Sequence, residues 1–182
     1  MLFILTNIFL FIVIIILFLL LSAVWPPDSP WAPWWTTKPE VAKKMCELAR
    51  VNKKSLVYDL GCGTGDALVV IAEKYGAKGV GIEIDPIRYL IAKWKVWSHE
   101  LSGDITLFRK NFFSINLSPA TVLFIYLVPA ALKRLTPKLL KELKKGTTIV
   151  SYIYPMPIDM YNGKLRLLVH DTEQQIFVYK FT

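Results

Sequence analysis

The chain has 182 residues, 54% of them hydrophobic, and a net charge of +8 at pH 7. That length leaves room for little more than one domain, and the two cysteines, which lack any metal or redox spacing, exclude a disulfide scaffold and predict no metal site. The positive charge makes an anionic membrane surface the first partner to consider. Nucleic acid is not expected as a partner, because no RNA-binding aromatic motif or added basic domain accompanies the charge.

The first 24 residues predict a membrane anchor. The run from Leu2 to Val24 contains no charged residue, and as a helix it would measure about 35 Å, against about 30 Å for the hydrocarbon core of a bilayer. A cleaved signal peptide is the alternative, but no basic residue precedes the run, and Leu21 is a poor partner for cleavage after Ala23. A retained single-pass transmembrane helix over residues 1–24 is therefore expected.

Residues 25–38 predict a linker at the membrane interface. The segment interleaves prolines with amphipathic rings that suit the headgroup level: Trp25, Trp31, Trp34 and Trp35. Whether Trp34 or Trp35 also folds over a ligand cleft stays open. Lys and Arg follow the apolar run but do not precede it, so the positive-inside tendency predicts a cytoplasmic domain. The basic residues of the first helix and of 138–145 are expected to turn its cleft toward the anionic inner leaflet.

Residues 39–182 alternate between helical and strand patterns. Helices are expected at 39–51, 66–75, 86–101 and 129–145, and strands at 55–60, 79–84, 105–109, 121–126, 147–152, 164–169 and 175–181. This alternation predicts one α/β domain over 39–182. Its doubly wound, mostly parallel seven-stranded sheet would carry helices on both faces.

Two segments of this domain interrupt the pattern. Thr136-Pro137 looks like a helix N-cap followed by a first-turn proline, so a break is expected inside the helix at 129–145. Residues 153–163 are too short and too rich in proline for a helix, and an irregular crossover is expected there. That crossover would leave Tyr152, Tyr154 and Met156 near the mouth of the cleft.

The segment from Val57 to Asp66 is the most informative stretch of the chain. An apolar strand ends at Asp59, and three alternating glycines follow before the next helix: Gly61, Gly63 and Gly65. Glycines let the backbone turn sharply and approach a ligand that a Cβ would exclude, at the strand-to-helix switch where open α/β sheets bind nucleotides. A tight strand-to-helix corner is the alternative, and the spacing lacks the third glycine of the dinucleotide fingerprint.

The next strand ends in a second acidic position. Glu83 stands about 20 residues after the loop, where a carboxylate can accept hydrogen bonds from both hydroxyls of a ribose. An exposed carboxylate at a strand end is the alternative. Asp85 precedes Pro86 at the start of a helical run, so it is expected to be the N-cap of that helix.

These two motifs resemble those of the class I S-adenosylmethionine (SAM) methyltransferases, which have a Rossmann-like fold. Residues 34–157 are similar to one branch of that superfamily, the membrane-anchored protein-lysine methyltransferases of the ATP synthase c-ring protein and the adenine nucleotide translocase. The resemblance implies SAM as cofactor, bound by Asp59, Gly61, Cys62, Gly63, Gly65, Glu83, Ile84, Asn111 and Phe112. The chain departs from these relatives with Thr64-Gly65-Asp66, where they often carry Asp-Gly-Arg, and with Asn111, where they often carry Asp.

The stretch after the fourth strand bears on the methyl acceptor. Ile125-Tyr126-Leu127-Val128-Pro129 lacks the Asn/Asp-Pro-Pro-Tyr/Phe motif of enzymes that methylate amide or adenine nitrogens. Tyr126 is the candidate for positioning the substrate, and a core or surface tyrosine is the alternative. The expected function is lysine methylation of a membrane-associated protein. Methylation of a lipid, a quinone or another small molecule, and a non-catalytic SAM-binding regulatory role, stay open.

Overall fold

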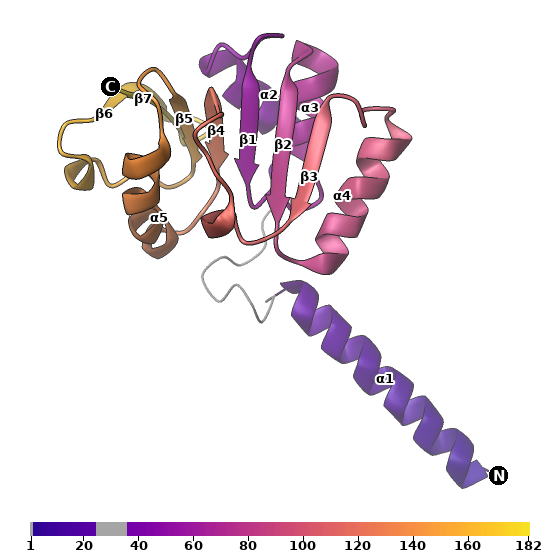
Figure 1. The fold of residues 1–182 in the computed structure, drawn as a ribbon. Helices are drawn as coiled ribbons and strands as arrows, with labels where there is room; N and C mark the ends of the chain where they lie inside the picture. The colour runs from indigo at the N-terminus through magenta and orange to yellow at the C-terminus, as the bar shows by residue number, and fades with distance from the viewer. Residues whose placement is uncertain (1, 25–35) are drawn as a thin grey trace.

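The computed structural model describes the backbone of residues 2–24 and 36–182 and the side chains of 3–19 and 36–182 (Figure 1). The first helix, α1, spans Leu2–Val24, and nearly all its described side chains are exposed and apolar. The predicted linker tryptophans, including Trp34 and Trp35, lie outside the described residues.

The structure bears on the predicted anchor in a limited way. Among the residues that the structure describes, no helix is both long enough and apolar enough to cross a membrane. A transmembrane α1 is therefore not supported by this structure and stays a prediction.

A seven-stranded sheet forms the centre of the domain, as the sequence predicted. The strand order is β3-β2-β1-β4-β5-β7-β6, with β1 to β5 parallel and β7 antiparallel to both of its neighbours. Order reverses between β1 and β4, which is the switch point where open α/β sheets bind ligands. The strands are β1 (Leu56–Leu60), β2 (Lys78–Glu83), β3 (Ile105–Arg109), β4 (Val122–Ile125), β5 (Thr148–Tyr152), β6 (Leu165–Asp171) and β7 (Ile176–Phe181).

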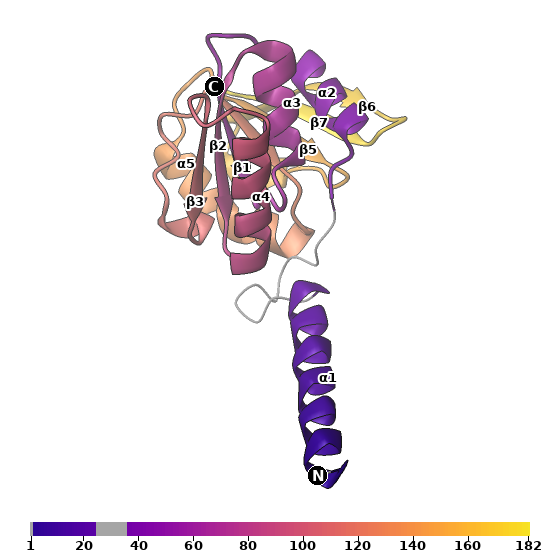
Figure 2. The same cartoon turned by 90° about the vertical axis from the view of Figure 1, so that its right-hand side faces the viewer.

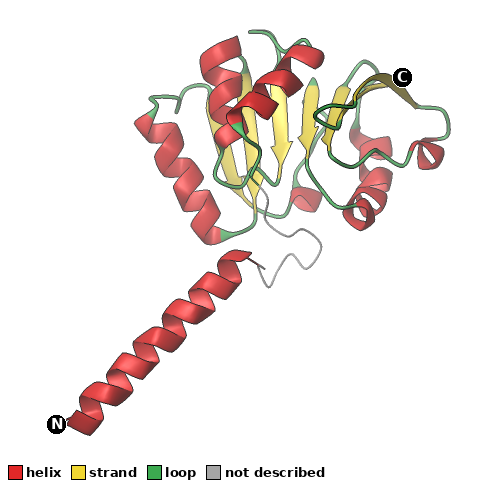
Figure 3. Cartoon of the chain, turned by 180° about the vertical axis from the view of Figure 1, so that it is seen from behind, coloured by secondary structure: helices red, strands yellow, loops and turns green. Residues whose placement is uncertain are grey.

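Helices cover both faces of the sheet (Figures 1 and 3). Apolar side chains of α2 and α3 form one core with one face of the strands, and those of α5 form a second core with the other face. The confirmed layers follow from strands that are buried on both faces, such as β4. The helices are α2 (Pro39–Leu48), α3 (Asp66–Tyr75), α4 (Pro86–Ser98) and α5 (Pro129–Glu142), with 3-10 turns η1 (Phe112–Ser114) and η2 (Ile158–Tyr161).

The predicted break in the last long helix was wrong. Helix α5 continues through Pro137, and Thr136 is not an N-cap, because its hydroxyl donates to the carbonyl of Leu132 at 2.9 Å. Proline has no N–H for the carbonyl four residues earlier, but that carbonyl belongs to Lys133, which is exposed and within reach of water. Burial of Leu135 and Leu139 on both sides of the proline holds the helix together.

The basic residues at the end of α5 do not lie beside the cleft. Helix α5 begins after the carboxyl end of β4 and runs back to the amino end of β5, where the amide of Thr148 donates to the carbonyl of Thr121. Lys144 and Lys145 therefore lie at the opposite edge of the sheet from the glycine loop. Lys138 pairs with Glu142 at 2.6 Å. The expectation that this cluster turns the cleft toward a membrane was wrong, because it ignored the direction of the helix.

Candidate functional site

The glycine loop is fastened to the end of β2. The amides of Gly61 and Cys62 both donate to the carbonyl of Ile82, at 2.8 and 3.1 Å. Gly61 has a φ of +84°, and a Cβ built there would meet no atom within 4 Å, so this side of the turn borders open space. Gly65 has a φ of +80°, and a Cβ there would lie 3.2 Å from the Cβ of Ala92 on α4. The first glycine thus leaves room beside the loop, and the third permits close packing of α3 and α4.

Glu83 joins the loop to the start of α4. Its side chain is only 6% exposed. One carboxylate oxygen accepts from the amide of Gly63 and the other from the amide of Asp85, each at 2.9 Å. Each oxygen has a second lone pair, so the carboxylate retains capacity for a ligand's hydroxyl groups. Asp85 is the N-cap of α4, as predicted, because its side chain accepts from the amide of Arg88 at 2.8 Å.

Asp59 is an ionisable group poised at neutral pH. It stands in β1 immediately before the loop and lines the hollow described below. Burial, and secondarily the charge of Glu83, raise the pKa of the Asp59 carboxyl from 3.8 to about 7. A cation brought into the hollow would favour the ionised carboxylate and lower this pKa.

The sulfur of Cys62 points into the protein core. A Cβ built on Gly81 would lie 2.8 Å from that sulfur and 2.5 Å from a methyl group of Leu68. Burial, and then the charges of Asp59 and Glu83, raise the pKa of the Cys62 thiol well above its usual value. Cys62 therefore stays a neutral thiol, and any role in binding a ligand falls to its backbone.

The start of α3 is clamped to α4 beside the loop. Asp66 accepts from the hydroxyl of Thr64 and forms an ion pair with Lys95, in each case at 2.5 Å. Burial alone would raise the pKa of the Asp66 carboxyl, but the hydrogen bonds from Lys95 and Thr64 outweigh it and hold the pKa below 3.8. The clamp fixes a carboxylate at the rim of the hollow.

A hollow opens beside the loop at the switch point. It encloses about 390 Å³, counting the space at its mouth, within the range of about 300 to 1,000 Å³ that is typical of small-molecule sites. It brings together four predicted residues of the β1 end and loop with Tyr126. The full lining is Thr36, Thr37, Asp59, Gly61, Cys62, Gly63, Thr64, Asp66, Ala67 and Tyr126.

Some lining residues were absent from the predicted site. Thr36 and Thr37 precede α2, and no local pattern linked them to the loop. Thr64 and Asp66 stand inside the glycine motif, so their position was the available signal. Within the described residues, no group of three or more His, Cys, Asp or Glu side chains is placed to hold a metal ion.

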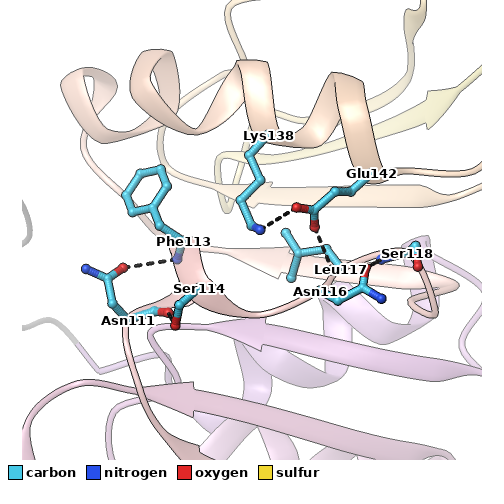
Figure 4. A network of polar contacts seen from close by, with 8 residues as sticks. All are labelled: Asn111, Phe113, Ser114, Asn116, Leu117, Ser118, Lys138 and Glu142. Atoms are coloured by element: carbon cyan, nitrogen blue, oxygen red, sulfur yellow. Dashed lines mark hydrogen bonds and ion pairs between the residues drawn. The ribbon is translucent and has the colours of Figure 1, made fainter.

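The remaining predicted cofactor residues lie along the same edge of the sheet but do not line this hollow. Ile84 follows Glu83, and the amide of Lys110 donates to the carbonyl of Glu83 at 3.1 Å. The side-chain oxygen of Asn111 accepts from the amide of Phe113 at 3.0 Å and so caps η1, which contains Phe112 (Figure 4). That oxygen has a second lone pair for a ligand's amine hydrogen.

The segment after η1 is held by α5. Glu142 accepts from the amide of Leu117 at 2.8 Å and from Lys138 at 2.6 Å (Figure 4). Lys138 is therefore occupied in fixing this loop. The contact keeps the backbone after Asn111 in place beside the sheet edge.

Tyr126 stands at the carboxyl end of β4 with two other tyrosines nearby. Its ring is half-buried and meets the ring of Tyr152 edge-on, with 4.7 Å between ring centroids. Burial, and then Tyr152 and Tyr154, raise the pKa of the Tyr126 hydroxyl. This hydroxyl stays protonated at neutral pH, and the rings make the cleft mouth aromatic, as expected for Tyr152 and Tyr154.

A strained turn holds two of these tyrosines. The amide of Tyr154 donates to the carbonyl of Tyr152 at 2.8 Å, across Ile153 with a φ of +65°. This is a γ-turn of the rarer, positive-φ kind, at a β-branched residue that disfavours it. The hydroxyl of Ser151 braces the turn by donating to the carbonyl of Tyr154 at 2.6 Å. Met156 does not reach the cleft mouth as expected, because it is 3% exposed within the core.

Comparisons with known proteins agree with this geometry. A profile of the family described as ANTKMT methyltransferase domain matches residues 59–160. The chain is 34% identical, over 84% of its length and 94% of the relative's, to a protein-lysine N-methyltransferase of Saccharolobus islandicus. It is 27% identical to a lysine N-methyltransferase of the ATP synthase c-ring protein from Caenorhabditis elegans, over 71% of its own length and 66% of the relative's.

A solved structure resembles the whole domain. It is an RNA methyltransferase from Salinibacter ruber in complex with S-adenosyl-L-homocysteine, with a TM-score of 0.71 and 32% identity. The match covers 81% of this chain and 93% of that one. The likeness therefore includes the glycine loop, Glu83 and the end of β4.

Proposed function

Since the chain belongs to the ANTKMT methyltransferase family and is a SAM-dependent methyltransferase, we propose that it methylates a lysine of a membrane-associated protein. The observation that carries this proposal is the 34% identity, over 94% of the relative's length, to a protein-lysine N-methyltransferase. The similarity to a methyltransferase of the ATP synthase c-ring protein supports a membrane protein as the target.

The chain's own residues suit SAM in a definite way. Bound SAM supplies a methyl group on a sulfonium that acts as its own leaving group. We assign Glu83 to the ribose hydroxyls, because its buried carboxylate keeps lone pairs beside the loop. Asp59 faces the cationic part of the cofactor, the backbone around Gly61 allows close approach, and Asn111 accepts from the adenine amine.

The aromatic mouth of the hollow suits a lysine side chain. An amine must be neutral to accept a methyl group, and half-buried rings disfavour its charged form and so lower its pKa. Tyr126 lies where the hollow opens, in contact with Tyr152. The proposed role of Tyr126 is to position and desolvate the amine, while solvent takes the proton. Alignment then supplies much of the rate enhancement.

We also propose the domain plan and location that the sequence suggested. Residues 1–24 form the anchor, 25–38 the interfacial linker and 39–182 the catalytic domain on the cytoplasmic side. Support comes from the absence of charge in α1 and from its exposed apolar side chains. A tethered enzyme meets targets in the same bilayer at high effective concentration.

The acceptor can be identified with native membranes and SAM labelled on its methyl group. After incubation with the full-length enzyme, label is measured in protein, organic-extractable lipid and RNA, and labelled protein is examined by mass spectrometry. Methyl-lysine in a membrane protein is the expected product. Label confined to lipid would replace the proposal with the lipid or quinone alternative, and SAM binding without any transfer would favour a regulatory role.

RNA is a second candidate acceptor because of one observation. The solved structure that is 32% identical to this chain is named as an RNA methyltransferase. Basic residues on the exposed surface would favour contact with a phosphate backbone. Label recovered in RNA, and lost after ribonuclease treatment, would establish this second candidate in place of lysine.

A further inference from the structure

The outward face of α4 carries a continuous apolar stripe. Its five side chains recur at intervals of three or four residues, which places them on one side of a helix: Ile87, Leu90, Ile91, Trp94 and Trp97. Leu90, Trp94 and Trp97 are 61%, 63% and 70% exposed. The opposite side of the helix buries Ala92 and Val96. Figure 2 shows α4 foremost along its flank of the sheet, so the α4 stripe faces outward.

The charges around the stripe are positive. Helix α4 contains no Asp or Glu, and Lys93 is exposed next to the stripe. Arg109 and Lys110 are exposed at the end of β3. They lie near the start of the helix, because the amide of Lys110 donates to the carbonyl of Glu83, two residues before the N-cap. Such a helix, with tryptophans in an apolar face and cations beside it, has the composition of helices that lie in a membrane interface.

We propose that the α4 stripe lies on the surface of an anionic lipid bilayer. The occupant follows from the charges, since Lys93, Arg109 and Lys110 complement acidic headgroups. A second copy of the chain facing the stripe about a two-fold axis would instead bring these cations together. Residues 25–35 between α1 and the domain span at most about 40 Å when extended, so a bilayer that takes up α1 is within reach of α4.

This placement also fixes the direction in which the cleft opens. Helix α4 begins beyond the carboxyl end of β2 and ends before the amino end of β3, so it runs along the strands. With α4 flat on the bilayer, the strands are parallel to the membrane, and the hollow at their carboxyl ends opens sideways along the surface. The inference therefore deepens the proposed function: the acceptor lysine lies at headgroup level.

The test uses the full-length chain reconstituted into liposomes, with a dye that reports polarity attached to one cysteine. Leu90→Cys places the dye on the stripe, at a position that is exposed and so tolerates it. Lys164→Cys is the matched control, exposed next to β6 at the opposite edge of the sheet. The native Cys46 and Cys62 are buried and escape labelling.

In liposomes that contain anionic lipid, the dye at 90 is expected to shift to shorter wavelength and to lose quenching by iodide, whereas the dye at 164 stays quenched. Lys93→Gln should lower the ratio of docked to undocked protein about fivefold, the equivalent of about 1 kcal/mol for one basic residue near the surface. Continued quenching at 90 on anionic liposomes would overturn the proposal. Equal protection in detergent without a bilayer would also overturn it, in favour of α1 or a second copy as the cover. Neither SAM nor acceptor is present, so the result is independent of methyl transfer.

Discussion

At the scale of single residues, Glu83 connects more of the site than any other predicted residue, because its carboxylate holds both Gly63 and Asp85. In Glu83→Gln one of those amides would face an amide donor in place of an acceptor. We expect the free energy of unfolding to fall by about 1 to 3 kcal/mol, with weaker SAM binding. Denaturant unfolding and calorimetry measure the two effects. Glu73→Gln, at an exposed carboxylate on α3, is the control; an equal loss in both variants would contradict the role of Glu83.

Asp59 gives the site a pH dependence. Its pKa of about 7 exceeds the value of 3.8 in the unfolded chain, so the folded protein without ligand loses stability as pH rises from about 4 through 7. Cationic SAM favours the ionised carboxylate. Its affinity should therefore rise with pH until about 7, by up to tenfold per unit, with release of a proton.

Calorimetry in buffers of different ionisation enthalpy counts that proton. In Asp59→Asn the proton release should disappear and the pH profile should flatten. An unchanged profile in this variant would assign the pH dependence to another group or to the ligand itself.

At the scale of elements, the γ-turn after β5 links backbone strain to the cleft mouth. Ile153→Gly should relieve the strain at φ +65° and leave stability unchanged or higher by about 1 kcal/mol. The looser turn should hold Tyr152 and Tyr154 less firmly, so KM for the acceptor should rise while SAM affinity stays constant. Glu100→Gly, at φ +57° after α4, is the control and should leave KM unchanged. A KM that does not respond to Ile153→Gly would separate the turn from the acceptor.

Local patterns predicted the elements but not their surroundings. The strand count, the parallel order and the N-cap at Asp85 followed from periodicity and from residue types at fixed offsets. The proline in α5 misled because packing of distant side chains kept the helix whole. Met156 is buried, and its amide bonds to the hydroxyl of Tyr179 on β7, a contact that no local pattern reveals.

The site was predicted in the same uneven way. Asp59 and the glycines lie together at the hollow because they adjoin in sequence. Thr37 arrives there through the path of the chain before α2, and Lys144 lies away from it because α5 runs back along the sheet. The exposure of the α4 stripe was also hidden, since apolar residues around a helix do not say which face the sheet covers.

At the scale of the whole molecule, the open prediction is the membrane anchor over residues 1–24. Full-length protein should remain with membranes after carbonate extraction, because an uncharged helix of this length is stable in hydrocarbon. Protease added outside intact cells should spare the domain if it is cytoplasmic. Ile12→Arg places a charge in the middle of α1 and should release a large share of the protein. A mature protein that begins near Val24 would show that the segment is a cleaved signal peptide.

The position of β7 between β5 and β6 has a consequence for folding. The hairpin of β6 and β7 can close locally, but the sheet is complete only when β7 pairs with β5 in antiparallel register. Until then β5 is an unprotected edge, with apolar residues such as Ile149 and Val150 beside unpaired backbone groups. Such edges recruit strands of other chains. Substitutions that slow closure of the hairpin should therefore lower the yield of folded protein through aggregation, even where they leave the finished cleft intact.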